Sequence, residues 1–232
     1  DIANDRIEQA TGIEQVNKAL TQMDASGKIV PMLATEWRSE GNDWIFKLRS
    51  GVKFHDGRAM TPADVVASFE RAINPDLKPD TTYLSGVTGA SVVGTDSVKI
   101  TTAAFDAAVP SRAKHIIITP ADWAAPTDKR LDDQMMGTGP YRFVAWNRGQ
   151  DIQMERFADY WGTKPSIEKV DFRFIPDASV RQAALEAGEI QIAYGMSGDL
   201  ADSAPKVISA PLSEVMILRP NQLYGPMMDL DL

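Results

Sequence analysis

Apolar and polar residues alternate along residues 170–175, where Val170, Phe172 and Phe174 occupy every second position. A period of two is typical of a strand with one buried face. Pro176 has no N–H group to donate to a strand ladder, so the strand should end before it. The pattern predicts a half-buried strand followed by a turn.

The spacing of apolar residues then becomes helical. Asp177 and Ser179 can accept hydrogen bonds from the free N–H groups at a helix start. Gly188 suits the left-handed position that commonly follows a helix end. Apolar residues recur at helical intervals between these two signals, at Val180, Ala183, Ala184 and Ala187. The sequence predicts a helix of about three turns here.

A second alternating segment, with Ile190 and Ile192, leads to Tyr194. A strand, a helix and a strand of these lengths predict a βαβ unit with parallel neighbouring strands and a right-handed crossover. Ligands bind at the carboxyl ends of strands in open sheets, which makes Tyr194 a candidate binding residue. A tyrosine that only closes a core strand would give the same pattern, and both interpretations stay open.

The first half of the chain predicts antiparallel strands and one longer helix. Residues 44–48 alternate, and Asp56-Gly57 is typical of a hairpin turn. Thr61 followed by Pro62 predicts a helix start, and Asn74-Pro75 predicts its end. The apolar face of this helix consists of Val65, Val66, Phe69, Ala72 and Ile73. Shorter patterns predict a helix around Ile13, Val16 and Leu20, and strands at residues 29–34, 91–102, 116–119, 141–145, 151–156 and 215–218.

Composition narrows the class of protein. The 232 residues carry a formal net charge of −8, which argues against strong non-specific binding to nucleic acid. The absence of cysteine excludes disulfides and thiolate metal sites. No apolar run is long enough to cross a bilayer, so the chain should not span a membrane. No signal peptide is present in this chain, as in a mature processed protein or a cytosolic one.

Signals for catalysis are weak. The segment around Ser197 resembles a serine nucleophile elbow, but Asp199 stands where that turn needs glycine. His55 lies beside a hairpin turn and is interpreted as an exposed turn residue. His115 flanks a short apolar strand and is interpreted as a core-edge residue. Two distant histidines without cysteine make no zinc site by spacing. We therefore expect no catalytic residue, no bound metal and no cofactor.

Several short motifs follow one another in a fixed order along nearly the whole chain. They are Asp24-Ala-Ser-Gly-Lys-Ile-Val-Pro31 with Leu33-Ala34 and Trp37, Trp44-Ile-Phe-Lys-Leu-Arg49, Gly51-Val-Lys-Phe-His-Asp-Gly57, Ala63-Asp-Val-Val66 with Ser68, Gly137-Thr-Gly-Pro-Tyr141, Tyr160-Trp-Gly162 and the strand–helix–strand unit described above. Each motif alone is weak, and the ordered set is specific. Together they resemble the family 5 solute-binding proteins of bacterial ABC importers, the kind that binds peptides or nickel.

The resemblance implies an α/β fold of the periplasmic-binding-protein type (type II, cluster C), a mixed sheet with an inserted small α+β domain. Residues 1–36 and 137–232 would form domain I of the first lobe, and residues 37–136 the inserted domain II. Family members usually begin with a strand and a leucine-aspartate-proline stretch, which residues 1–6 do not match. They are also longer, so we expect the second ligand-binding lobe to be largely missing.

The resemblance also implies ligand-binding residues at positions that match the family's motifs. Tyr83 matches an aromatic residue that faces the cleft from domain II, and Tyr194 matches a tyrosine at a strand end in peptide-binding members. Met216 and Leu218 match cleft-facing positions on the next strand, where peptide binders carry larger or charged groups. Arg112 lies within one residue of an arginine that nickel-binding members use on the carboxylates of a metal chelate.

The implied function is capture of an oligopeptide or a metal chelate and its delivery to an ABC permease in the inner membrane. The implied location is the periplasm, or the cell surface as a lipoprotein in a Gram-positive source. Two other functions stay open. One is a hydrolase of α/β type, which the missing nucleophile–base pair disfavours. The other is a sensory or chaperone-like relative that keeps the fold and signals through a partner.

Overall fold

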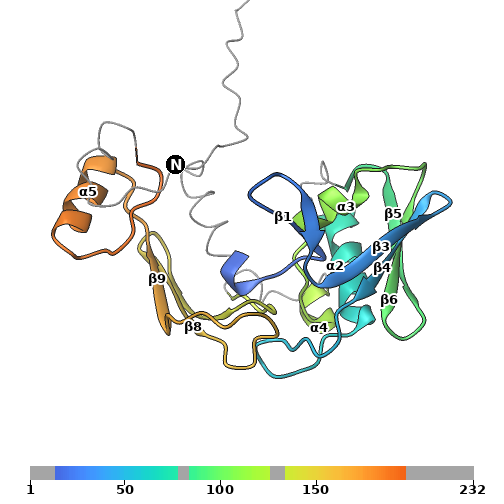
Figure 1. The fold of residues 1–232 in the computed structure, drawn as a ribbon, viewed down its shortest axis with the longest axis horizontal. Coiled ribbons are helices and arrows are strands. Elements are labelled where there is room, and N and C mark those ends of the chain that lie inside the picture. Colours follow the sequence, from blue (N-terminus) through green and yellow to red (C-terminus); the bar gives the residue numbers. More distant parts are fainter. Residues whose placement is uncertain (1–13, 78–83, 126–133, 197–232) are drawn as a thin grey trace, which may run out of the picture. The chain divides into compact units, whose positions relative to one another are not determined.

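The computed structural model describes residues 14–77, 84–125 and 134–196 (Figure 1). The chain divides into two compact units, Asp1–Phe174 and Ile175–Leu232. The predicted domain boundaries near residues 36 and 136 both lie within the first unit and stay predictions.

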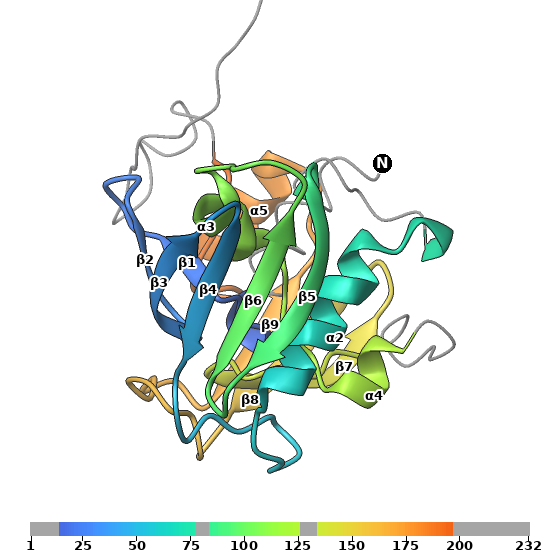
Figure 2. The same cartoon turned by 90° about the vertical axis from the view of Figure 1, so that its right-hand side faces the viewer.

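A four-stranded antiparallel sheet forms one part of the first unit. Its strand order is β3 (Ala34–Glu40), β4 (Asp43–Leu48), β6 (Ser97–Thr102) and β5 (Val87–Val93). Figure 2 shows these strands side by side, with α2 (Pro62–Ile73) next to β5. The predicted alternation in β4 places Trp44 and Phe46 opposite Ile100 and Val98. The predicted helix at 62–73 is confirmed.

The main core lies under this sheet. Phe46 of β4 and Phe69 of α2 are completely buried, so one face of the sheet packs on the apolar face of the helix. The other face carries ion pairs between neighbouring strands, including Lys47–Glu36 and Lys99–Asp43. An antiparallel sheet with one buried and one charged face explains the alternating sequence of its strands. Leu20, Leu33, Phe54, Val65 and Ile118 complete this core from other segments.

Short elements connect this sheet to the rest of the first unit. They are β1 (Thr21–Met23), which pairs with β2 (Ile29–Pro31), followed by η1 (Pro75–Leu77), α3 (Val109–Arg112), η3 (Ala113–His115) and α4 (Ala121–Ala124). The helix predicted around residues 13–20 ends by Val16. The strand predicted at 116–119 is wrong, because this segment forms no ladder although Ile116 and Ile118 are buried.

A second antiparallel sheet has the order β7 (Tyr141–Asn147), β8 (Asp151–Arg156) and β9 (Lys169–Arg173). Its core contains Val16, Tyr141, Ile152 and Met154, and Val170, Phe172 and Phe174 pack against it half-buried. The predicted strand at 170–175 is therefore confirmed as β9, with its apolar residues on the buried side.

The second unit begins with the predicted helix, α5 (Ala178–Glu186). Asp177 Oδ1 accepts the backbone N–H groups of Ser179 at 2.9 Å and Val180 at 3.0 Å, as an N-cap does. Gly188 has a positive φ of 75°, which ends the helix. The Gly188 N–H donates to Leu185 O at 3.1 Å, and the next N–H donates to Ala184 O at 2.9 Å. Both predicted helix ends are confirmed.

The second strand of the predicted βαβ unit is absent from the described residues. Residues 190–194 form no strand, and β9 pairs with β8 in an antiparallel ladder instead of a parallel one. Ile192 is 80% exposed. A strand needs a neighbour for its N–H and C=O groups, and residues 190–194 have no ladder partner within 14–77, 84–125 and 134–196. The prediction of parallel strands is therefore wrong for this part of the chain.

Candidate functional site

Two of the five candidate ligand residues fall in the described part of the chain, Arg112 in the first unit and Tyr194 in the second. Tyr83, Met216 and Leu218 lie outside the described residues. Their roles as ligand-binding residues therefore stay predictions.

Arg112 is the last residue of α3, and Asp106 organises the turn that leads into that helix. The Asp106 carboxylate accepts the N–H of Ala108 at 2.8 Å. The helix is fixed on its other side by Thr21 of β1, whose hydroxyl donates to Pro110 O at 2.7 Å. The short helix thus has a defined position against β1, and the position of Arg112 follows from it.

The Arg112 guanidinium is held by two oxygen atoms. Its Nη1 donates to Asp106 Oδ2 at 2.6 Å and to Ser85 O at 3.0 Å. The Arg112 side chain is still 33% exposed, and the Asp106 side chain is 27% exposed. A guanidinium presents five N–H donors in a planar fork, so two contacts through Nη1 leave a cation that can approach a carboxylate.

Aromatic rings adjoin this ion pair. Trp44 Nε1 donates to Asp106 O at 2.9 Å. The Trp44 ring stacks on Phe105 with the ring centroids 6.1 Å apart. Phe105 is 55% exposed, so its ring is accessible from solvent. Arg112, Asp106, Trp44 and Phe105 form what we name the arginine corner: a cation, an anion and an accessible apolar ring. The sequence motifs identified Arg112 and missed its three neighbours.

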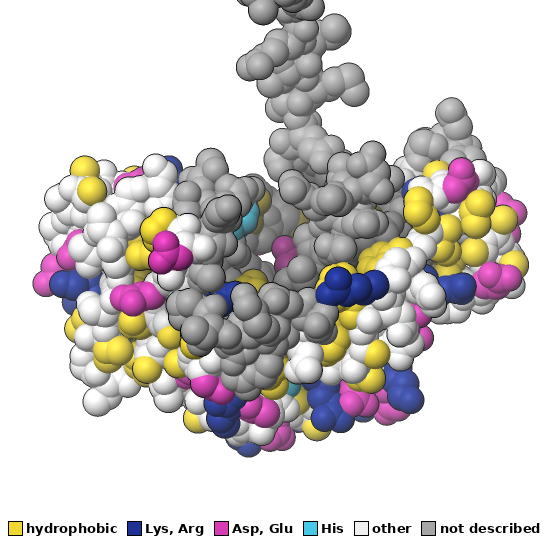
Figure 3. Space-filling model, turned by 180° about the vertical axis from the view of Figure 1, so that it is seen from behind, with side chains coloured by type: hydrophobic (Ala, Val, Ile, Leu, Met, Phe, Trp, Pro, Cys, Tyr) yellow, Lys and Arg dark blue, Asp and Glu magenta, His cyan; other side chains and the backbone are white. Residues whose placement is uncertain are grey.

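Tyr194 is 54% exposed in the second unit, so it does not close a core strand. The segment that contains it is tethered to the start of α5 by Arg181. Arg181 Nη2 donates to Gly195 O at 3.2 Å, and its Nη1 donates to Ile175 O at 2.6 Å and to Pro176 O at 2.9 Å. Figure 3 shows apolar side chains gathered over the unit that contains α5, where Val180, Ile192 and Tyr194 are exposed. The role of Arg181 was not predicted from the sequence.

Neither histidine has the environment expected from the sequence. The His55 ring is half-buried and meets Phe157 edge-on, with centroids 5.0 Å apart. Burial lowers the pKa of His55 to about 4. The prediction of an exposed turn residue is therefore wrong, because residues distant in the sequence cover the turn. His115 is exposed at the end of η3, so its interpretation as a core-edge residue is wrong too.

Within 14–77, 84–125 and 134–196, no group of three or more His, Asp or Glu side chains could hold a metal ion. In the same ranges, no helix has the length and apolarity needed to cross a bilayer.

Solved structures of periplasmic binding proteins share this fold. The chain aligns with AgaA of A. tumefaciens R10 in complex with agropinic acid at a TM-score of 0.73 and 30% identity, over 79% of this chain and 38% of that one. It aligns with NikZ of Campylobacter jejuni in complex with Ni(L-His) at a TM-score of 0.72 and 25% identity, over 77% of this chain and 37% of that one. The α/β periplasmic-binding-protein fold predicted from the sequence is confirmed.

Residues 28–232 match the family described as bacterial extracellular solute-binding proteins, family 5 Middle, and the chain belongs to this family. It is 34% identical over 199 residues to the glutathione-binding protein GsiB of Pectobacterium atrosepticum. It is 30% identical over 221 residues to a dipeptide-binding protein of Escherichia coli K12. Each alignment covers 83% of this chain but only 38% and 41% of the respective relative. The family resemblance drawn from the ordered motifs is confirmed.

Proposed function

We propose that the chain is part of an extracytoplasmic solute-binding protein that captures a small peptide-like or chelate-like solute and delivers it to an ABC permease. Membership of family 5 supports the solute-binding role. Relatives are named for binding glutathione and dipeptides, and similar structures hold agropinic acid, Ni(L-His) or a nonapeptide. The relatives are solute-binding proteins, so the proposal includes no enzymatic step.

The arginine corner is the feature of the described residues that best supports a binding role. The solutes named above share carboxylate groups, and guanidinium is the side-chain group best shaped to bind a carboxylate through two N–H groups. Arg112 is accessible and already oriented by Asp106 and Ser85. We propose that Arg112 receives a solute carboxylate, and we keep Tyr83, Tyr194, Met216 and Leu218 as candidate ligand residues from the family motifs.

The first prediction tests this role directly. The chain spans 38% of the length of its GsiB relative and should supply only part of a ligand's contacts. We therefore expect it to bind a dipeptide weakly, with a dissociation constant in the millimolar range, about −4 kcal/mol. The Arg112→Gln variant should bind the free dipeptide about 10-fold more weakly, because a charge-assisted hydrogen bond is lost. NMR chemical-shift titration measures affinities in this range.

The C-terminal amide of the same dipeptide serves as the ligand control, because it lacks the carboxylate. Its affinity should be the same for the native chain and for Arg112→Gln. The matched protein control is Arg38→Gln, which removes a 70% exposed arginine on the charged face of the four-stranded sheet. Equal weakening of the acid and the amide by Arg112→Gln, or an equal effect of Arg38→Gln, would exclude Arg112 as the carboxylate contact.

The two alternatives predict different observations. A hydrolase would turn over a panel of peptides or esters, and Ser197→Ala would abolish that turnover. We expect no turnover, since the elbow-like segment around Ser197 lacks the required glycine. A sensory relative would be encoded beside a sensor kinase, whereas an import protein is expected beside a permease and an ATPase.

A further inference from the structure

The hairpin turn at residues 53–59 is held by two segments that lie far from it in the sequence. The His55 N–H donates to Gly137 O at 3.1 Å, and His55 Nε2 lies 3.1 Å from Gly139 O. Lys53 Nζ pairs with Asp159 Oδ2 at 2.7 Å. These contacts join the predicted inserted domain, residues 37–136, to segments 137–139 and 157–161 of the predicted domain I. We name this set of contacts the hairpin junction.

The neighbouring residues reinforce the junction without contributing a titrating group. Arg49 lies over the Trp161 ring, 4.6 Å from its centroid. Trp161 Nε1 in turn donates to Thr138 O at 3.0 Å. The hydrogen bond from Lys53 holds the pKa of Asp159 below its ordinary value, so this ion pair persists in mildly acidic solution. His55 is thus the member of the junction whose protonation state changes between neutral and acid pH.

Burial of the His55 ring favours its neutral form, whereas the hydrogen bond to Gly139 O acts in the opposite direction and raises the pKa of His55. Gly139 O can only accept, so Nε2 must carry the proton. Nδ1 is buried and has no hydrogen-bond partner among the described residues. A second proton on Nδ1 would be a buried donor without an acceptor, which is unfavourable. The edge-on contact with Phe157 adds an apolar neighbour and no acceptor.

Two charged groups also act on the ring, and they oppose each other. Asp56 favours the imidazolium and Arg142 disfavours it. Asp56 is already paired with Arg58, at 2.7 Å from Nε, and Arg142 is paired with Glu155. Burial is the largest effect, and it places the pKa of His55 at about 4 in the folded chain against 6.5 for an exposed histidine. The junction is therefore assembled around a neutral histidine.

We propose that His55 is an acid-sensitive latch: protonation of its Nδ1 releases the 53–59 hairpin from Gly137 and Gly139 while the four-stranded sheet stays folded. The closed junction binds fewer protons than the open one between pH 6.5 and 4. The neutral His55 therefore contributes its full stabilisation of the closed junction above pH 6.5. This stabilisation decreases as the pH falls from 6.5 to 4. At pH 5 the ratio of open to closed junction should be roughly 20-fold higher than at pH 7.

The chain contains two histidines, which makes the test direct. An NMR titration of both ring signals should show His55 titrating near pH 4 and His115 at a distinctly higher pH. Amide hydrogen exchange, corrected for its intrinsic pH dependence, should show opening at residues 53–59 that increases roughly 20-fold from pH 7 to pH 5. Amides of β4 and β6 should show no such increase.

Two variants separate the latch from general acid sensitivity. His55→Gln keeps an N–H donor for Gly139 O but does not titrate, so its hairpin exchange should be independent of pH in this window. His115→Gln should behave like the native chain. Titration of His55 near pH 6.5, or an unchanged acid response in His55→Gln, would overturn the proposal. If His55→Gln does not fold, the pH at which the native His55 ring titrates still tests the proposal.

Discussion

Gly139→Ala should destabilise the first unit by about 3–5 kcal/mol, at the upper end of what a single substitution does. The Gly139 N–H donates to Val16 O at 2.9 Å, which brings two backbones into direct contact. A Cβ atom on Gly139 would lie 2.2 Å from Gln15 O and 2.7 Å from Val16 O. Both obstacles are backbone atoms, so no side-chain rotation can relieve the clash. Chemical denaturation followed by tryptophan fluorescence measures the loss.

Gly89→Ala is the matched control for this prediction. Gly89 lies in β5, and a Cβ atom there would meet nothing within 4 Å. Its backbone is also outside the left-handed region, so alanine is tolerated and the free energy of unfolding should change by less than about 1 kcal/mol. Gly137→Ala should resemble Gly139→Ala, because its Cβ would lie 2.3 Å from Val16 O. Similar stabilities for Gly139→Ala and Gly89→Ala would show that segments 15–17 and 137–139 are not in contact.

The features that the sequence predicted correctly are those whose signals lie within a few residues of one another. The ends of α5 follow from Asp177 and Gly188, each of which acts on backbone groups of its own turn. The start of α2 follows from Thr61 and Pro62 in the same way. The alternation that predicted β9 reports which side of that strand is buried, and no knowledge of its neighbours was needed.

The wrong predictions concern contacts between distant segments. The apolar alternation at residues 190–194 is a local signal, but a strand also needs a partner that the described residues do not supply. His55 looks exposed in its own turn and is covered by Gly139 and Phe157, which follow much later in the sequence. Gly137 and Gly139 entered the sequence analysis only as part of a family motif, although their lack of side chains is what permits contact with Val16.

At the candidate site, too, the contacts between near residues were predictable and those between distant residues were not. The family motifs pointed to Arg112, and its ion pair with Asp106 joins residues only six positions apart. Ser85, which also binds Arg112, lies 27 positions from it, and Trp44 of the arginine corner lies 62 positions from Asp106. No periodicity in the sequence brings such residues together, so the environment of a candidate ligand residue required the fold.

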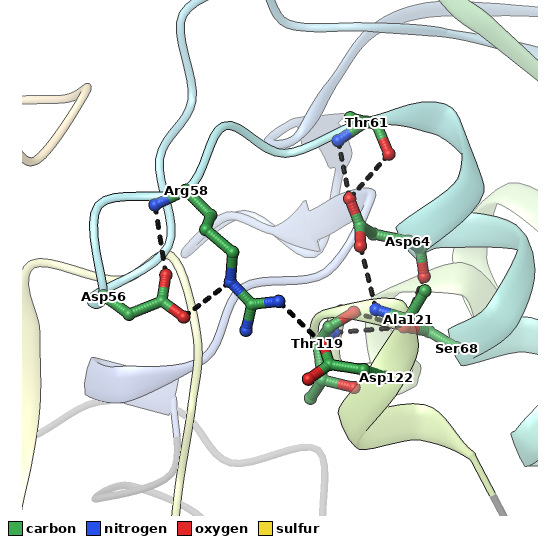
Figure 4. Close-up of polar contacts among 8 residues, drawn as sticks. All are labelled: Asp56, Arg58, Thr61, Asp64, Ser68, Thr119, Ala121 and Asp122. Atoms are coloured by element: carbon green, nitrogen blue, oxygen red, sulfur yellow. Dashed lines mark hydrogen bonds and ion pairs between the residues drawn. The ribbon is translucent and has the colours of Figure 1, made fainter.

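Substitution of Asp64 should have the second large effect on stability, because its one buried carboxylate accepts hydrogen bonds at the starts of two helices (Figure 4). Its Oδ2 accepts the backbone N–H and the hydroxyl of Thr61, both at 2.7 Å, and thereby fixes the start of α2. Its Oδ1 accepts the N–H of Ala121 at 2.8 Å, at the start of α4. Ser68 continues the connection, since its hydroxyl accepts the N–H of Thr119 at 3.0 Å.

Asp64→Ala should therefore lower the free energy of unfolding by about 2–4 kcal/mol, because three donors lose a charged acceptor in a place that water reaches poorly. Asp64→Asn should lose nearly as much, since its amide group would point a donor at another donor. Glu70→Ala, an exposed acidic residue on the same helix, should change stability by less than about 0.5 kcal/mol. Urea unfolding of the three variants gives the comparison. An Asp64→Asn variant as stable as the native chain would mean that the carboxylate does not join α2 to α4.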